Sequence, residues 1–302
     1  GRVSGYRFFE GIMNSSARLT YDRVARVLEQ GVEAVRADDP EIVPLAPRLE
    51  ELQRLFRALL EARHQRGAVD FSGSDAEVVL DDAGRVESVR PLVRNDAHRL
   101  IEECMIAANV AAARFLGHHE LAGLYRVHDS PSASRVEDLR GFLAGLGVAV
   151  PGDEIPTPRD LQQLLESVAH RPDRSVIETV VLRTMKQAQY AARNDGHFGL
   201  ALTAYTHFTS PIRRYADLLV HRAIRHVIRS RTESKHVLRQ RGAGVLPKAA
   251  IYPYEHAGLE GIGEHISATE RRADTASRDM LDWLKCEFME GRVGDDFEGT
   301  VA

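Results

Sequence analysis

The spacing of hydrophobic residues along the chain predicts a mainly helical fold with a small number of strands. In the long stretches apolar side chains recur every three or four positions, as they do on one buried face of an α-helix. We therefore expect an α+β fold with helices packed on an antiparallel sheet. The helices are predicted over residues 20–31, 49–63, 95–116, 175–192, 211–224 and 267–291, with shorter ones following residues 131 and 158. The buried face of the helix over 95–116 is predicted to contain Ile101, with Glu102 and Glu103 to either side of that face. The last helix is predicted to open with a capping box at Ser267 and to carry Ala273, Ala276 and Met280 inward.

Strand patterns are fewer and shorter than the helical ones. Residues 77–89 read as a β-hairpin, with a glycine in the turn between two alternating segments. Residues 3–19 alternate loosely and predict a strand without its upstream partners, so we expect the sheet to be incomplete. Another strand is predicted over residues 297–301. Residues 232–254 carry charges, glycines and prolines, which indicates an excursion across the surface.

Composition is that of an ordinary globular protein, with 43% hydrophobic and 28% charged residues among 302. No apolar run approaches the roughly 20 residues of a membrane span. The chain begins at Gly1 and ends within a predicted strand, so we expect part of a larger protein. Cys104 and Cys286 lie in helical patterns, which favours two buried, reduced thiols and a cytoplasmic location.

The formal net charge of −4 argues against a uniformly basic nucleic-acid binder. Any contact with nucleic acid must therefore come from a local concentration of charge. Residues 211–242 contain nine Lys or Arg against two acidic residues. Taken alone, such a run is more often a solvated face than a binding site.

The start of this basic stretch has the features of an anion site. Ser210 and Pro211 have the sequence of a helix N-cap and first residue, so a helix is predicted to begin at Pro211. Arg213 and Arg214 then fall in the first turn, where free amides and the helix dipole already favour phosphate. The alternative is that the arginines pair with Asp217 one turn later. The buried face of this helix is predicted to contain Ile212, Tyr215, Ala216, Leu219 and Ala223.

The segment Thr209-Ser-Pro-Ile-Arg-Arg-Tyr-Ala-Asp217 resembles the catalytic domain of the ribonuclease II and ribonuclease R exoribonucleases, and the ribonuclease R branch fits best. The resemblance implies an RNB-type catalytic domain over residues 1–290 and the start of an S1 RNA-binding domain, of the OB type, over 291–302. It also implies magnesium-dependent, processive 3′-to-5′ hydrolysis of single-stranded RNA to nucleoside 5′-monophosphates, in RNA decay and processing. Further matching stretches are residues 94–109, 197–200, 270–274 and 282–286.

By the same resemblance, particular residues acquire expected roles. Arg213 would be catalytic and stabilise the charge that develops at the phosphate, next to the RNA-binding Ser210 and Arg214. Tyr21 would stack against a base, although its helical spacing alone predicts a core residue. Phe71 would line the RNA channel, although a lone Phe is more often packing. Glu102 would contact the ribose or phosphate, although from the pattern alone it is a surface charge.

The resemblance implies magnesium, but we expect no metal ligands in this chain. The family's metal-binding aspartates lie upstream of residue 1, so the segment alone is expected to be inactive. Asp81 and Asp82 are predicted to be turn residues beside Gly84 and not metal ligands. The dipeptide His128-Asp129 is weak evidence for a metal site. The competing hypothesis is a non-catalytic RNA-binding or scaffold module of the same fold. In either case we expect a monomer that binds single-stranded RNA and no membrane.

Overall fold

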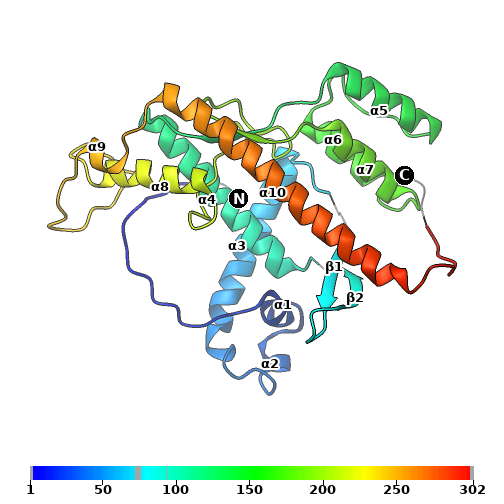
Figure 1. Cartoon of the computed structure of the whole chain (residues 1–302). Helices are drawn as coiled ribbons and strands as arrows, with labels where there is room; N and C mark the ends of the chain where they lie inside the picture. The colour runs from blue at the N-terminus through cyan, green and yellow to red at the C-terminus, as the bar shows by residue number, and fades with distance from the viewer. Residues whose placement is uncertain (1–2, 72–75, 93, 300–302) are drawn as a thin grey trace.

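The computed structural model describes residues 3–71, 76–92 and 94–299 and confirms a mainly helical α+β fold (Figure 1). Within those ranges the strands form two antiparallel pairs, β1 with β2 and β3 with β4. The strands are β1 (Ala76–Leu80), β2 (Val86–Pro91), β3 (Tyr125–Val127) and β4 (Gln189–Ala191). The helices are α1 (Tyr21–Gln30), α2 (Val32–Val35), η1 (Val43–Leu45), α3 (Ala46–Arg66), α4 (Asp96–His118), α5 (Ala133–Gly145), α6 (Pro158–Ser167), α7 (Arg174–Thr184), α8 (Tyr215–Ile228), α9 (Lys248–Ile251) and α10 (His256–Glu290).

Local signals set several of these boundaries where the sequence predicts them. The Thr20 hydroxyl accepts from the amide of Arg23 at the start of α1, and Asn95 accepts from the amide of His98 at the start of α4. Gly67 adopts φ +74°, a left-handed conformation that ends α3. The predicted hairpin is also confirmed as β1 and β2.

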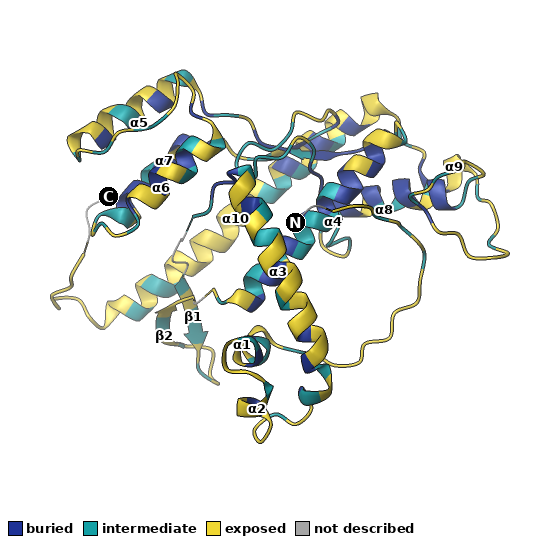
Figure 2. Ribbon diagram, turned by 180° about the vertical axis from the view of Figure 1, so that it is seen from behind, coloured by how far each residue is buried: buried dark blue, intermediate teal, exposed yellow. Residues whose placement is uncertain are grey.

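Helix α10 differs from its prediction at both its start and its exposed end. It begins eleven residues before Ser267, which is buried in mid-helix. The Ser267 hydroxyl donates to the carbonyl of Gly263 at 2.7 Å and accepts from the amide of Tyr190 at 2.9 Å, so it joins β4 to α10 instead of capping a helix. The part of α10 after Glu270 is largely exposed (Figure 2), and so are the predicted inward residues Ala273, Ala276 and Met280.

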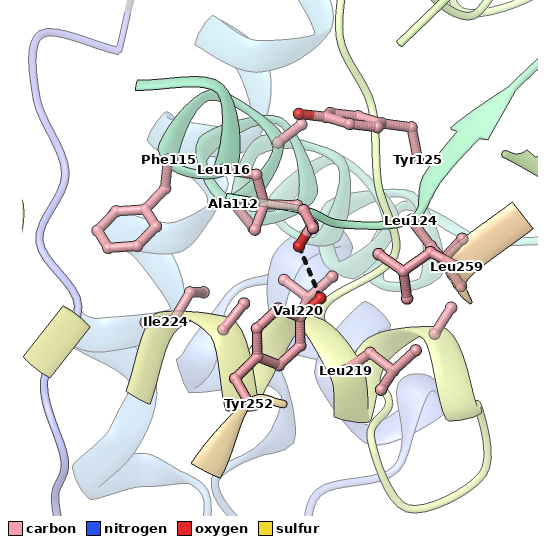
Figure 3. Packing of buried hydrophobic residues seen from close by; sticks show 14 of the residues in the cluster. Ala112, Phe115, Leu116, Leu124, Tyr125, Leu219, Val220, Ile224, Tyr252 and Leu259 are labelled. Atoms are coloured by element: carbon pink, nitrogen blue, oxygen red, sulfur yellow. Dashed lines mark hydrogen bonds between the residues drawn. The ribbon is translucent and has the colours of Figure 1, made fainter. Parts of the chain in front are cut away.

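The largest core lies between α4, α8 and the first turns of α10 (Figure 3). Side chains of α4 such as Phe115 and Leu116 face α8 residues such as Leu219 and Val220. Tyr252 is buried among them, and its hydroxyl donates to the carbonyl of Ala122 at 2.6 Å. Residues 232–254 are therefore only partly the surface excursion predicted. A second core lies among α5, α6 and α7, and a third lies between α1, α2 and the start of α3.

Three further predictions are wrong. Residues 3–20, all described, form an extended segment without a strand, because Phe8 makes only an isolated bridge with Val237. The helix predicted over 175–192 ends at Thr184, since the chain becomes extended and β4 pairs with β3. Cys286 is exposed and Cys104 is half-buried. Residues 295–299 contain no strand, and the rest of the strand predicted there lies outside the described residues.

No helix in the described ranges is both long enough and apolar enough to cross a membrane.

Candidate functional site

The segment that leads into the arginine pair is held by buried polar side chains. Asn109 of α4 donates from Nδ2 to the Tyr205 hydroxyl at 3.0 Å and accepts at Oδ1 from the amide of Phe208 at 2.9 Å. The Thr206 hydroxyl donates to the carbonyl of Leu124 at 2.6 Å. The Tyr190 hydroxyl lies 2.8 Å from Nδ1 of His207. Buried hydrogen bonds of this kind specify one backbone path, so the turn that follows is firmly placed.

Helix α8 begins at Tyr215, so the predicted start at Pro211 is wrong. Arg214 is extended, at φ −120° and ψ 121°, and residues 211–213 form a turn. The reason is Asp217, whose carboxylate is fully buried. It accepts from Nε and Nη2 of Arg214, both at 2.8 Å, and from the amide of Ser210 at 2.7 Å. The alternative pairing with Asp217 is therefore observed for Arg214.

Arg213 has the opposite surroundings. Its side chain is exposed and makes no hydrogen bond or ion pair with any residue that the structure describes. Its neighbours Ile212 and Tyr215 are also exposed, so the predicted buried face is wrong at those two positions, while Ala216, Leu219 and Ala223 are buried. The turn therefore presents one unpaired guanidinium beside another whose carboxylate partner is fixed.

The surroundings of this turn favour negative charge. Burial, followed by the charges of Arg214 and Arg126, lowers the pKa of His207 to about 2, and Arg213 contributes in the same direction. Burial lowers the pKa of His197 to about 3, with His128 and Arg126 as further causes. Both imidazoles are therefore neutral at physiological pH, mainly because they are largely removed from solvent, and the nearby arginines act in the same direction. An anion next to Arg213 would be stabilised by the positive charge of these arginines.

Tyr21 is the first residue of α1 and is 45% exposed, so it is not a core residue. One face stacks on His98 of α4, with ring centroids 3.9 Å apart and planes 23° apart. Asn95 donates to the carboxylate of Asp22 at 3.3 Å and joins the same two helices. The ring is thus held in place while part of its surface stays open to a ligand.

Glu102 belongs to a network centred on Arg63, a buried residue in the last turn of α3. Nη1 of Arg63 donates to Glu103 at 2.7 Å and to Glu102 at 3.2 Å. Its Nη2 lies 3.5 Å from Asp70, directly before Phe71. Glu102 also pairs with Arg94. The Glu102 side chain is 37% exposed, and its carboxylate is held in place from two sides by Arg63 and Arg94.

Sequence reasoning missed the roles of Arg63 and Glu103. The predicted face of α4 contained Ile101, which is exposed, whereas Glu103 is buried. The only available signal was the acidic pair 102–103, placed to either side of the apolar face. A buried carboxylate needs a cationic partner, and Arg63 is 40 residues away in the chain.

Helix α4 contains Glu102 and contacts both Tyr21 and the segment that leads to Arg213. His98, Glu102 and Asn109 lie on one stripe, because rotations of about 100° per residue place them within about 40° of one another. At 1.5 Å per residue the stripe is roughly 16 Å long. It runs from Tyr21 past Glu102 to the segment that leads to Arg213. Phe71 lies off this stripe and lines a separate cavity with His128 and His197.

Comparison of the sequence with known proteins identifies the family to which the chain belongs. The sequence model described as RNB domain matches residues 1–230. The chain belongs to this RNB domain family. Ribonuclease R of Escherichia coli is 45% identical over 302 residues, which is all of this chain and 36% of that protein. Ribonuclease R of Vibrio cholerae is 46% identical over 302 residues, which is 35% of that protein. The chain thus spans about a third of these relatives.

The fold agrees with that assignment. Mycoplasma genitalium RNase R, solved in complex with ribose methylated single-stranded RNA, superposes with a TM-score of 0.72 at 24% identity. The match covers 91% of this chain and 40% of that one. The RNB domain family together with relatives named Ribonuclease R makes this an exoribonuclease family.

The described residues do not fit a metal ion. Among them no group of three or more His, Cys, Asp or Glu side chains could hold one. Asp81 accepts from the amides of Ala83 and Arg85, both at 2.9 Å, as a turn residue does. His128 lies 2.6 Å from the carbonyl of Lys186 and accepts from the amide of Gly199, so both its nitrogens have backbone partners. We derive no step through a metal from these residues.

Proposed function

We propose that this chain forms the strand-binding and charge-stabilising part of a 3′-to-5′ exoribonuclease that hydrolyses single-stranded RNA processively to nucleoside 5′-monophosphates. The observation that carries the proposal is the turn at residues 210–214. There Asp217 fixes Arg214 and the backbone, and Arg213 is left exposed without a described partner. The proposal includes a monomeric, cytoplasmic protein that acts in RNA decay and processing.

In this proposal Arg213 binds a phosphate oxygen next to the bond that breaks. Its guanidinium stabilises negative charge as that charge grows in the transition state. Because Arg214 is paired with Asp217, the backbone that carries Arg213 is fixed, and only the Arg213 side chain has to become ordered on the phosphate. Further along the strand Tyr21 stacks on a base, and the Glu102 carboxylate accepts from a ribose 2′-hydroxyl.

Magnesium is the proposed cofactor, with ligands that lie outside this chain. The described residues offer no metal-binding group, and the chain spans only about a third of the Ribonuclease R relatives. The bound ion would supply an activated water and neutralise the leaving oxygen.

The lack of a metal-binding group among the described residues also favours a second candidate function. If no metal ligands are present anywhere in the protein, the chain is a non-catalytic module that binds single-stranded RNA. Tyr21, Glu102 and Arg213 would then bind the strand without shortening it.

The deciding experiment is incubation of the purified full-length protein, which in this proposal includes the metal ligands that lie outside this chain, with 5′-labelled single-stranded RNA and magnesium. We expect stepwise 3′ shortening that a chelator abolishes. Arg213→Ala should slow shortening about 10²- to 10³-fold with a smaller loss in binding. Arg231→Ala is the matched control, because Arg231 is also exposed and its side chain has no hydrogen bond or ion pair in the described structure.

The possible outcomes separate the two candidates. Arg213→Ala protein that shortens RNA at the wild-type rate contradicts the assigned role of Arg213. Binding that is retained while the wild-type protein leaves the RNA at full length supports the non-catalytic module.

A further inference from the structure

A cavity of about 970 Å³ is lined by residues of α5, α7 and α10 and by residues 197–200. This is within the usual size range of small-molecule sites. Its described lining contains no Asp or Glu, although the whole chain has a net charge of −4. Four cationic side chains line it instead, namely Arg135, Arg183, Lys186 and Arg278.

Most of this positive charge is not neutralised by carboxylates. The guanidinium groups of Arg183 and Arg278 have no hydrogen bond or ion pair within the described ranges. Arg135 donates only to backbone carbonyls, including that of Arg183 at 3.1 Å. Lys186 pairs with Asp129 at 3.2 Å, and both of these side chains are substantially exposed. The cavity therefore favours an anion, and arginine forks match phosphate oxygens well.

The remaining wall of the cavity has flat rings that carry no charge. Phe71, His128 and His197 line it, and the two imidazoles stack with centroids 5.0 Å apart. Nδ1 of His128 accepts from the amide of Gly199, so its Nε2 carries the proton that it donates to the Lys186 carbonyl. Burial lowers the pKa of both imidazoles, which keeps them neutral. Flat neutral rings can contact a base without regard to its identity.

We propose that this cavity is a nucleotide site in which Arg135, Arg183, Lys186 and Arg278 bind a phosphate while Phe71 contacts the base. The inference rests on the proposed function, which supplies the nucleotide. Of the residues that line this cavity, the resemblance connects only Phe71 with RNA, so the four cations are a new assignment. The phosphate belongs either to the bound strand or to a released nucleoside monophosphate, and both present the same chemistry.

The test is to titrate the purified protein with adenosine 5′-monophosphate and with adenosine at low salt, using calorimetry. The monophosphate should bind about tenfold or more tightly than adenosine, because charge-assisted bonds need the phosphate. A double variant, R183Q with R278Q, should lose that advantage. The control is R271Q with R272Q, two exposed arginines of α10 that do not line the cavity.

A second arm identifies the source of the phosphate. The strand occupies the cavity if the monophosphate competes with a short single-stranded RNA for binding and the double variant has a lower affinity for that RNA. If the monophosphate binds without competing, the cavity takes the free nucleotide. Either result supports the inference.

The inference is overturned if monophosphate and adenosine bind equally, or if the double variant binds the monophosphate as well as the control does. Arg213→Ala separates this from the proposed function. Loss of monophosphate binding in that variant alone would place the nucleotide at the turn before α8, so the cavity assignment would fail while the proposed function stands.

Discussion

At the scale of single residues, Arg213 and Arg214 are neighbours in the chain with opposite surroundings. Arg214 is fixed by two hydrogen bonds to a fully buried carboxylate, whereas Arg213 is exposed and without a partner in the described structure. Arg214 therefore holds the turn, and Arg213 is available to a ligand. Replacing each in turn should therefore separate stability from activity.

Arg214→Ala should lower the free energy of unfolding by about 3 kcal/mol, because Asp217 would remain as a buried charge without its cation. Arg213→Ala should change it by less than about 0.5 kcal/mol, as exposed side chains usually do. Urea unfolding of both proteins is the measurement. Equal stability of the two variants would show that the Arg214–Asp217 pair does not hold the turn.

Tyr21→Ala should weaken binding of single-stranded RNA by about 1–3 kcal/mol and change the length of the final product, because a stacking face is lost. Tyr21→Phe is the control, since it keeps the ring that stacks on His98. Product sizing on gels and binding titrations measure both effects. Unchanged products and affinity in the Ala variant would remove Tyr21 from the RNA site.

At the scale of elements, the contact between α10 and β4 decides where both of them lie. The Ser267 hydroxyl accepts from the amide of Tyr190, and Gly263 lies against the same strand. A Cβ at Gly263 would come within 2.8 Å of the carbonyl oxygen of Tyr190, so only glycine permits this approach. The close contact brings the helix against the strand next to Arg126, whose guanidinium pairs with Glu270 of α10 at 2.6 Å.

Gly263→Ala should therefore destabilise the protein by about 1–3 kcal/mol through overpacking against backbone. Gly261→Ala, two residues earlier in α10, should instead stabilise it by about 0.5–1 kcal/mol, because a Cβ there meets no described atom within 4 Å and alanine favours helix. Thermal or urea unfolding compares the pair. A Gly263→Ala protein as stable as its Gly261→Ala counterpart would mean that α10 can move away from β4 at little cost.

At the scale of the whole molecule, two half-buried neutral histidines connect stability to pH. Loss of solvation, with nearby positive charges, lowers the folded pKa of His207 to about 2 and that of His197 to about 3. In the unfolded chain a histidine has a pKa near 6.5. Above that pH neither state binds the proton. Below that pH the unfolded state binds protons at these histidines and the folded state does not, so stability falls as the pH falls.

Between pH 6.5 and 5 each of these histidines should therefore lower the free energy of unfolding by up to about 1.4 kcal/mol per pH unit. Denaturant unfolding across that range measures the slope. His207→Gln should reduce the slope, whereas His64→Gln, at an exposed position of α3, should leave it unchanged. A slope that is the same in all three proteins would contradict the burial of His207 as its cause.

The sequence by itself determined the elements whose signals are local. Thr20, Asn95 and Gly67 set helix ends, because caps and left-handed glycines act within one turn. The Thr209–Asp217 motif indicated the family and the arginine pair. Local signals thus predicted most helices, the hairpin and the region of the site.

Only the tertiary structure decided which of these residues are free and which are bound. The start of α8, the position of Ser267 and the burial of Glu103 depend on Asp217, Tyr190 and Arg63, and two of these three contacts join residues at least 40 positions apart. Even the Arg214–Asp217 pair forms because Asp217 is buried by the packing of α8, which spacing along the chain does not reveal. A buried polar group needs a hydrogen-bond partner, which can come from any part of the chain that the fold brings close. The periodicity of hydrophobic residues does not identify that partner.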